Sequence, residues 1–246
     1  MPFVALHGFT LTGAQFEPLA DGLGRRVLAP DLPGHGRTGL EPVSIEATMA
    51  VLASWLAYHD GPVPVLGYSQ GARIALLLAL DHPELISQLI LVSGSPGISA
   101  DAVRARRRQT DEAVAAEIEA VGVETFLDSW LTQPLTSNAA VSPETASRDR
   151  AIRSENTAAG LAAALRGLGQ GALPYVGDRL GDLPIRVLTV AGGRDQKYRA
   201  LAMEMAAAAP RGSFVIVETA GHNVVLEQPQ ALAGAVATFL AETPAA

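Results

Sequence analysis

Short apolar runs rich in Val, Ile and Leu recur along the chain, separated by longer segments. These runs are Phe3–Leu6, Arg26–Ala29, Val63–Leu66, Gln88–Val92, Ile185–Val190 and Ser213–Val217. Their nearly continuous apolar character is typical of strands that are buried on both faces of a parallel sheet. Helical patterns occupy Ile45–Tyr58, Gln70–Asp81, Tyr198–Ala209 and Pro229–Ala241. Strand alternating with helix predicts an α/β fold with a mostly parallel sheet and helices on both faces.

The alternation stops between about residues 95 and 183. This segment has helix-like patterns rich in Ala, Glu and Arg and contains no convincing strand, with breaks at Pro134, at Pro143 and over 167–171. It is either a separate helical domain or a lid, and an insertion of about 90 residues between two strands favours a lid over an active site. We therefore predict a core made of residues 1–94 and 184–246, with a helical cap over 95–183.

The pentapeptide Gly-Tyr-Ser-Gln-Gly at 67–71 joins a predicted strand to a predicted helix. A G-x-S-x-G in this position is the pattern of a nucleophile elbow, a turn so tight that the neighbours of the serine must be small. Gly67 and Gly71 meet that requirement. Glycines and serines also meet by chance in ordinary turns, so the strand–turn–helix context carries the prediction. Ser69 is the predicted catalytic serine.

Composition narrows the class of protein. With 246 residues, 48% of them apolar, the chain can build one α/β core. It has no cysteine, which excludes disulfides, thiolate metal sites and cysteine nucleophiles. A net charge of −7 argues against nucleic acid, and no apolar run reaches the roughly 18 residues that cross a bilayer. No zinc motif, P-loop or dinucleotide fingerprint is present. We expect a cytoplasmic enzyme with no metal and no organic cofactor, whose oligomeric state the sequence leaves open.

A serine hydroxyl is a weak nucleophile and needs a positioned base. His222 is the best candidate because it follows the last predicted strand, where a doubly wound sheet opens its ligand crevice. His7 and His35 lie in glycine-rich turns and are interpreted as loop histidines that hydrogen-bond the backbone. Asp195 follows the fifth predicted strand and can accept the second imidazole N–H. The order Ser69, Asp195, His222 is that of α/β-hydrolases.

An oxyanion hole is expected beside this triad. In the same fold it uses the backbone N–H of the residue after the serine and one N–H from the early loop. These positions correspond to Gln70 and to Phe9, which follows His7 and Gly8. Backbone amides leave little trace in a sequence, so this prediction depends on position alone.

Arginines indicate the substrate class. Arg73 lies four residues after Ser69, one helical turn along the same face, among apolar neighbours. Such a guanidinium needs a partner, either a nearby acid or an anion of the substrate. Further arginines open the insertion at 104 and 106–108 and recur at 148, 150 and 153. Most of these are expected to be solvated. Their concentration over the serine nevertheless predicts a small substrate that carries carboxylates.

Several motifs resemble those of the 2-succinyl-6-hydroxy-2,4-cyclohexadiene-1-carboxylate synthases of menaquinone biosynthesis. They are Asp-Leu-Pro-Gly-His-Gly, Gly-Tyr-Ser-Gln-Gly-Ala-Arg, Ser-Pro-Gly-Ile, the run ending at Asp111, Trp130 with Pro134-Leu135, Ile152-Arg153-Ser154, Gly-Gly-Arg-Asp-Gln-Lys-Tyr and Gly-His-Asn. The resemblance covers nearly the whole chain, and its part in the insertion is more specific than the triad. It implies an α/β-hydrolase fold.

The resemblance also implies a lyase activity. Enzymes of that family eliminate pyruvate from a cyclohexene that bears succinyl, carboxylate and enolpyruvyl groups, with the serine–histidine pair abstracting a proton. By position, it implies that the substrate pocket is lined by Tyr68, Arg73, Arg107, Trp130 and Arg153. Three substrate carboxylates are consistent with several arginines, and an enolate is consistent with an oxyanion hole.

Three positions depart from the family pattern. Val225 stands where relatives often have a histidine, Gly193 where they often have a glutamate, and Ala72 where they often have a glycine. None of these changes removes a predicted catalytic group. They leave open the alternative of a serine hydrolase that acts on a small ester or on a carbon–carbon bond.

Overall fold

A six-stranded parallel sheet forms the centre of the molecule. The computed structural model describes residues 2–39, 42–137 and 139–242. The strands, in chain order, are β1 (Phe3–Leu6), β2 (Val27–Leu28), β3 (Val63–Tyr68), β4 (Ile86–Val92), β5 (Arg186–Gly192) and β6 (Gly212–Val217). Their order across the sheet is β2-β1-β3-β4-β5-β6, and each neighbouring pair is parallel. The predicted α/β fold with a parallel sheet is confirmed.

The central strands are apolar throughout because both of their faces are covered. Every residue of β1 and β3 is buried. The edge strands differ: β2 has only two residues, and β6 leaves Ser213 and Phe214 exposed. The second predicted strand is therefore shorter than the apolar run Arg26–Ala29, because only its two middle residues pair with β1. Apolar character locates a strand but does not fix how much of it finds a partner.

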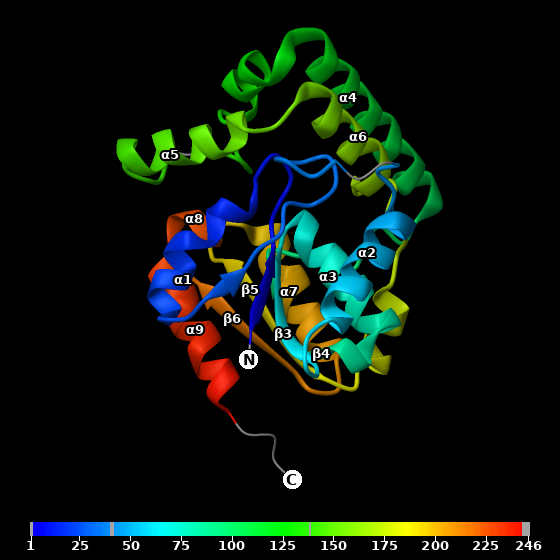
Figure 1. Cartoon of the computed structure of the whole chain (residues 1–246), viewed down its shortest axis with the longest axis vertical. Coiled ribbons are helices and arrows are strands. Elements are labelled where there is room, and N and C mark those ends of the chain that lie inside the picture. Colours follow the sequence, from blue (N-terminus) through cyan, green and yellow to red (C-terminus); the bar gives the residue numbers. More distant parts are fainter. Residues whose placement is uncertain (1, 40–41, 138, 243–246) are drawn as a thin grey trace.

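Helices pack against the two faces of the sheet (Figure 1). On one face lie α2 (Ile45–Ala57), α3 (Gln70–Asp81) and α7 (Gln196–Ala208), which share an apolar cluster with the sheet. On the other lie α1 (Glu17–Leu23) and α9 (Pro229–Ala241), in a second cluster. Four of these five were predicted, whereas the seven-residue α1 is too short to show a clear period.

Three helices between β4 and β5 lie over the carboxyl ends of the strands (Figure 1). They are α4 (Asp101–Trp130), α5 (Pro143–Ser154) and α6 (Ala158–Leu168). Packing of α4 on α6 buries a separate apolar cluster that includes Ile118, Phe126 and Leu161. Helix α4 is kinked at Gly122, whose φ of 79° and ψ of 166° interrupt the helical backbone. The region 95–183 therefore folds as helices with a small core of its own.

The remaining elements are short. They are the 3-10 helices η1 (Gly13–Phe16), η2 (Pro83–Leu85) and η3 (Gly177–Asp182), and helix α8 (Val224–Glu227). Within the described ranges, no helix combines the length and the apolar character that a bilayer crossing requires.

Candidate active site

Ser69 occupies a strained turn between β3 and α3. Its backbone has φ 52° and ψ −105°, a conformation that costs a non-glycine residue on the order of 1–3 kcal/mol. The turn is closed by contacts that leave no room for side chains on the flanking glycines. A Cβ on Gly71 would lie 2.1 Å from the Leu6 carbonyl oxygen, and one on Gly67 would lie 2.4 Å from the Gly71 carbonyl oxygen. Close packing of β1, β3 and α3 thus holds the serine in its strained geometry.

Ser69, His222 and Asp195 form a hydrogen-bonded chain. The distance from Ser69 Oγ to His222 Nε2 is 3.1 Å, and that from His222 Nδ1 to Asp195 Oδ2 is 2.8 Å. A carboxylate only accepts hydrogen bonds, so the imidazole carries its proton on Nδ1 and donates it to Asp195. Nε2 then has a free lone pair and accepts the serine hydroxyl proton. This tautomer is the one that a general base requires.

Asp195 is held in place by its position at the start of α7. Its Oδ1 accepts a hydrogen bond from the Tyr198 N–H at 3.2 Å, which caps the helix. Burial alone would raise the pKa of this carboxyl. The hydrogen bonds from His222 and Tyr198, with the positive charge of His222 and Lys197, instead hold that pKa below its ordinary value. Asp195 is therefore ionised at neutral pH and can stabilise an imidazolium.

His222 follows β6 and is fixed from several sides. Its carbonyl oxygen accepts a hydrogen bond from Ser93 Oγ at 2.7 Å, which ties the loop to the end of β4. Its ring lies between two tyrosines, with ring centroids 5.8 Å from Tyr68 and 4.4 Å from Tyr198. Packing and hydrogen bonds together limit the base to one orientation.

A cavity of about 350 Å³ is bordered by Ser69 and by residues of α3, α4, α5, α6 and α7. Nine of the ten residues that the sequence singled out border it: Phe9, Tyr68, Ser69, Gln70, Arg73, Arg107, Trp130, Arg153 and His222. The tenth, Asp195, lies behind His222 and borders a neighbouring depression. The fold thus brings together residues from five separate segments of the chain.

Two of the cavity arginines already have acidic partners. Arg153 has only 3% of its surface exposed, and its Nε and Nη2 contact the two carboxylate oxygens of Asp149 at 2.7 and 3.2 Å. Arg153 also donates to Thr10 Oγ1. Arg107 contacts Asp111 at 2.7 Å and donates to Gln170 Oε1 at 2.6 Å. These acids fix the guanidinium groups and neutralise much of their charge.

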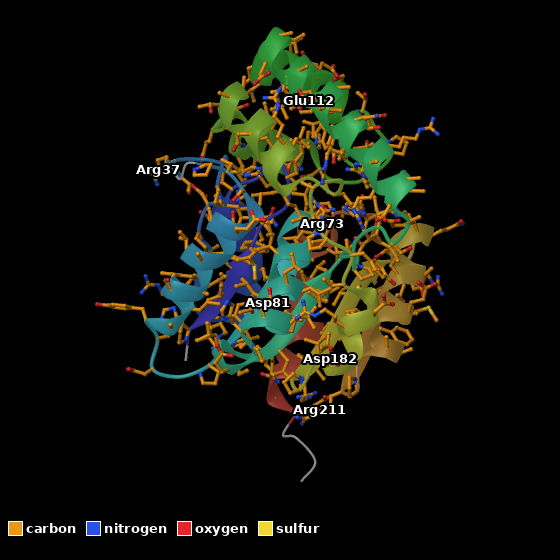
Figure 2. The ribbon with its side chains drawn as sticks, turned by 90° about the vertical axis from the view of Figure 1, so that its right-hand side faces the viewer. Arg37, Arg73, Asp81, Glu112, Asp182 and Arg211 are labelled. Carbon is orange, nitrogen blue, oxygen red and sulfur yellow. The ribbon has the colours of Figure 1, made fainter. Side chains whose placement is uncertain are left out.

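Arg73 has no acidic partner among the described residues. Its side chain rises from α3 to the level where the core meets the helices above it (Figure 2). The Nε atom is buried and has no hydrogen-bond partner in the described part of the chain. Burial, with a smaller effect from Arg107, lowers the pKa of Arg73 from its ordinary value. A partly buried guanidinium without an ion-pair partner among the described residues has the chemistry to bind an anion.

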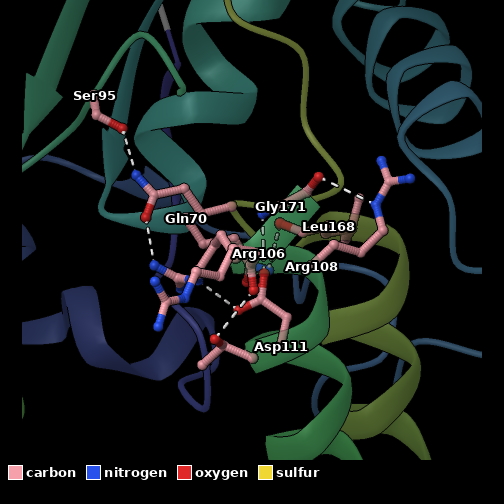
Figure 3. Close-up of polar contacts among 10 residues, drawn as sticks. Gln70, Ser95, Arg106, Arg108, Asp111, Leu168 and Gly171 are labelled. Atoms are coloured by element: carbon pink, nitrogen blue, oxygen red, sulfur yellow. Dashed lines mark hydrogen bonds and ion pairs between the residues drawn. The ribbon is translucent and has the colours of Figure 1, made fainter. Parts of the chain in front are cut away.

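Hydrogen bonds connect the foot of α4 to the cavity floor (Figure 3). Gln70 Nε2 donates to the Leu168 carbonyl at 3.1 Å, and the Gly171 N–H donates to Asp111 Oδ2 at 2.9 Å. Gln170 Nε2 donates to Ser95 Oγ at 3.3 Å. These bonds tie the loop after α6 to both the elbow and α4, so the arginine-bearing wall is held against the serine.

Aromatic side chains also line the cavity. Trp130 stacks on Phe126 with centroids 5.2 Å apart and meets Phe9 edge to face at 5.7 Å. The indole Nε1 of Trp130 is buried without a hydrogen-bond partner among the described residues. A buried tryptophan N–H usually has a partner. Trp130 borders the cavity, where this N–H is available as a donor to a ligand.

His7 and His35 bond the backbone, as the sequence analysis expected. His7 Nε2 accepts the Leu32 N–H at 2.8 Å, and His35 Nε2 accepts the Thr10 N–H at 3.3 Å. Burial lowers the pKa of His7 to about 4 and that of His35 to about 3. Both are therefore neutral acceptors at pH 7. They shape the early loop that carries Phe9 into the cavity.

Sequence reasoning left several cavity groups unassigned. Lys197 and Tyr198 border the cavity and stand two and three residues after Asp195. Both belong to the motif Gly-Gly-Arg-Asp-Gln-Lys-Tyr, but nothing in the sequence assigns either of them a chemical role. The partners of the arginines had a clearer signal. Asp111 and Asp149 each lie four residues from their arginine within one helix, a spacing that brings the side chains together.

The fold and the site define the class of this protein. A model of the alpha/beta hydrolase family matches residues 3–235, and the chain belongs to that family. A 2-succinyl-6-hydroxy-2,4-cyclohexadiene-1-carboxylate synthase from Salmonella paratyphi C (strain RKS4594) is 30% identical, covering 96% of this chain and 92% of its own. Within the alpha/beta hydrolases, the chain is thus a member of the 2-succinyl-6-hydroxy-2,4-cyclohexadiene-1-carboxylate synthase family.

Solved structures agree with this placement. The structure of MenH from S. aureus has a TM-score of 0.92 and 30% identity, and the match covers 98% of this chain and 93% of that one. A thermophilic esterase from Thermogutta terrifontis, solved with bound malate, has a TM-score of 0.81 and 26% identity, over 98% of this chain and 89% of its own. The fold is thus shared with hydrolases.

Proposed function

We propose that this chain is the pyruvate-eliminating synthase of its family, acting in menaquinone biosynthesis. Its substrate would be a cyclohexene that carries a succinyl group, a ring carboxylate, a ring hydroxyl and an enolpyruvyl ether. Its product would be 2-succinyl-6-hydroxy-2,4-cyclohexadiene-1-carboxylate. One observation carries the proposal: a Ser69–His222–Asp195 relay lies beneath a cavity that holds an arginine without a counter-ion.

In this proposal the relay removes a proton rather than forming an acyl-enzyme. His222 Nε2 accepts the Ser69 hydroxyl proton, and the serine oxygen in turn takes a proton from the carbon next to the succinyl ketone. The C–H electron pair forms an enolate and then a ring double bond as the C–O bond to the enolpyruvyl group breaks. The departing enolpyruvate takes up a proton and becomes pyruvate, so the reaction needs no redox partner and no water.

The enolate oxygen would be held by the backbone N–H groups of Phe9 and Gln70. Both residues border the cavity beside Ser69. Gln70 is the first residue of α3, where N–H groups have no acceptor within the helix and the helix dipole favours negative charge. Preorganised donors of this kind typically contribute about 2.7–4 kcal/mol each to transition-state stabilisation.

The substrate carboxylates would meet the positive side of the cavity. Arg73, Arg107 and Arg153 are the proposed contacts, and Tyr68 and Trp130 are proposed to line the ring-binding surface. Arg107 and Arg153 each use part of the guanidinium group to bind an aspartate. The N–H groups that remain can orient a substrate carboxylate. Arg73, which has no such partner, is the strongest candidate for a full ion pair with the substrate.

The experiment measures pyruvate release from the succinyl-enolpyruvyl-cyclohexene substrate beside hydrolysis of a neutral p-nitrophenyl ester. The proposal expects stoichiometric pyruvate, formed by wild-type protein and abolished in Ser69→Ala. The alternative, a serine hydrolase of small esters or carbon–carbon bonds, uses the same triad through an acyl-serine. Rapid ester hydrolysis without pyruvate release would exclude the synthase and leave the hydrolase.

A further inference from the structure

Lys197 is the only lysine in the chain. The sequence has 18 lysine and arginine residues, and the other 17 are arginines. The single lysine lies at the active-site cavity, beside Tyr198 and across from Arg73 in the same lining. Because every other Lys or Arg position in the chain holds arginine, the single lysine at the cavity suggests that an ammonium group has a function there.

The stability of the fold does not explain a lysine at this position. Lys197 is the second residue of α7, in the first turn of the helix. A positive charge there opposes the helix dipole, which favours acidic groups at its N-terminal end. No ion pair to Lys197 is found within the described ranges, and its side chain is exposed. Its Nζ lies 5.3 Å from the centroid of the Tyr198 ring, and its charge makes a small contribution to the lowered pKa of Asp195.

The charges that line the cavity leave two cations unneutralised. Arg107 is paired with Asp111 and Arg153 with Asp149, while Asp195 is bonded to His222. The remaining lining acid, Glu117, is exposed on α4. In the described part of the chain, Arg73 and Lys197 are the lining cations without an acidic partner. One is partly buried on α3, and the other lies at the solvent edge on α7.

We propose that the Lys197 ammonium binds a carboxylate of the substrate at the solvent edge of the cavity. This inference rests on the proposed function for the identity of that substrate. Contact with Tyr198, whose ring packs on His222 at 4.4 Å, keeps the ammonium on the cavity side of the helix. Lys197 then supplies the outer contact for a multiply charged ligand, and Arg73 supplies an inner one.

An ammonium suits this edge better than a guanidinium. It is a compact, strongly hydrated point charge on a flexible stem, with three donors that can follow a moving carboxylate. A charge at the rim of a binding site acts mainly on the association rate and on its salt dependence. Lys197 is thus a substrate-binding and steering group. Its effect on the relay is the smallest of the named contributions to the lowered pKa of Asp195.

The kinetic test compares Lys197→Gln and Lys197→Arg with a matched control, Arg199→Gln. Arg199 is an exposed cation on the same helix that does not border the cavity. We expect Lys197→Gln to lower kcat/KM for pyruvate release about three- to tenfold at low ionic strength, with kcat nearly unchanged. The loss should shrink above 0.5 M salt, where exposed charges are screened. Lys197→Arg should recover most of the activity and its salt dependence, and Arg199→Gln should match wild type.

A structural role or a tuning of the triad would give different results. Loss of a stabilising contact would lower the unfolding midpoint of Lys197→Gln, whereas removal of a cation from a helix N-terminus should leave it unchanged or raise it. Tuning of the Asp195–His222 pair would lower kcat at every salt concentration. Either result, or Lys197→Arg as impaired as Lys197→Gln, would overturn the inference.

A binding measurement keeps the inference testable if the proposed function fails. Reductive methylation with ¹³C-formaldehyde labels one lysine side chain, because Lys197 is the only one, and preserves its charge. Titration with pyruvate and succinate at constant ionic strength should shift this signal by NMR, and chloride should not. If wild-type protein releases no pyruvate but the signal shifts, the proposed function fails and the carboxylate contact stands. If no carboxylate moves the signal and Lys197→Gln releases pyruvate normally, the contact fails and the function stands.

Discussion

At the scale of single residues, substitutions in the proton relay are expected to reduce turnover most. Ser69→Ala and His222→Ala should each reduce kcat by several orders of magnitude, and the double variant should lose little more, because the two groups act as one unit. Asp195→Asn should cost less than either, since it orients the imidazole. Steady-state pyruvate release measures all four variants. Near-normal turnover by Ser69→Ala would contradict the role of the elbow.

Substitution of Arg73 should affect substrate binding without lowering the stability of the fold. Arg73→Ala should cost about 2–5 kcal/mol in kcat/KM, as loss of a buried charge partner does. It should leave the free energy of unfolding unchanged or higher, because Arg73 has no counter-ion within the described residues. Arg73→Lys should recover only part of the activity, since an ammonium lacks the planar fork.

Arg153→Ala should behave differently. It removes one side of the buried Arg153–Asp149 ion pair, so unfolding by urea should show a loss of about 3–5 kcal/mol. Activity assays at low temperature on the folded fraction then report its share in substrate binding. If Arg153→Ala were as stable as wild type, the Asp149 ion pair would not be the buried contact described above.

At the scale of the elements, the elbow depends on backbone contacts between β1 and α3. Gly71→Ala would place a methyl group 2.1 Å from the Leu6 carbonyl oxygen, so strand and helix must separate. We expect a loss of stability of more than about 2 kcal/mol, together with a loss of activity, as strain or overpacking in a core produces. Gly234→Ala is the matched control, because Gly234 lies within α9 with nothing inside 4 Å of the added atom. It should gain about 0.5–1 kcal/mol by helix propensity.

At the scale of the whole molecule, two buried histidines should make the fold sensitive to acid. The pKa of His7 is lowered to about 4 and that of His35 to about 3, against an ordinary value of 6.5. Between those values the unfolded chain binds more protons than the folded one, so stability rises with pH. This contribution is complete above pH 6.5 and is lost as the pH falls toward 4 and 3.

The expected size of this effect is about 1.4 kcal/mol per pH unit for each histidine across that window. Urea unfolding at pH 7.0, 6.0 and 5.0 measures it. Replacement of His35 by Gln, whose amide oxygen can still accept the Thr10 N–H, should reduce the slope by up to half. An unchanged slope would show that these rings are not the groups that titrate.

Metal removal is a second test on the whole molecule. Within the described ranges, no cluster of three or more His, Asp or Glu side chains could hold an ion. The proposed relay uses only protein groups. Dialysis against a strong chelator should leave pyruvate release unchanged, and a large loss restored by a divalent cation would contradict the proposed mechanism.

The sequence by itself determined the fold class, all six strands to within about two residues at each end, and the positions of Ser69, Asp195 and His222. These follow from local information. Apolar runs mark strands buried on both faces, and a small-residue elbow can be recognised from five consecutive positions. The loop role of His7 and His35 was predictable in part for the same reason, because each Nδ1 bonds a carbonyl within its own turn. Their Nε2 bonds join two loops 25 residues apart, which the sequence does not reveal.

Only the tertiary structure decided how the charges of the cavity are balanced. Arg73, Arg107 and Arg153 look equivalent as arginines in a sequence. In the structure, two have buried aspartate partners, and Arg73 has none among the residues that the structure describes. The place of Lys197 on the cavity that His222 also borders appears only when α7 and the loop after β6 meet. Charge pairing depends on distances of a few ångströms between segments far apart in the chain. Hydrophobic periodicity carries no information about those distances, because it reports which face of an element is buried and not what it meets.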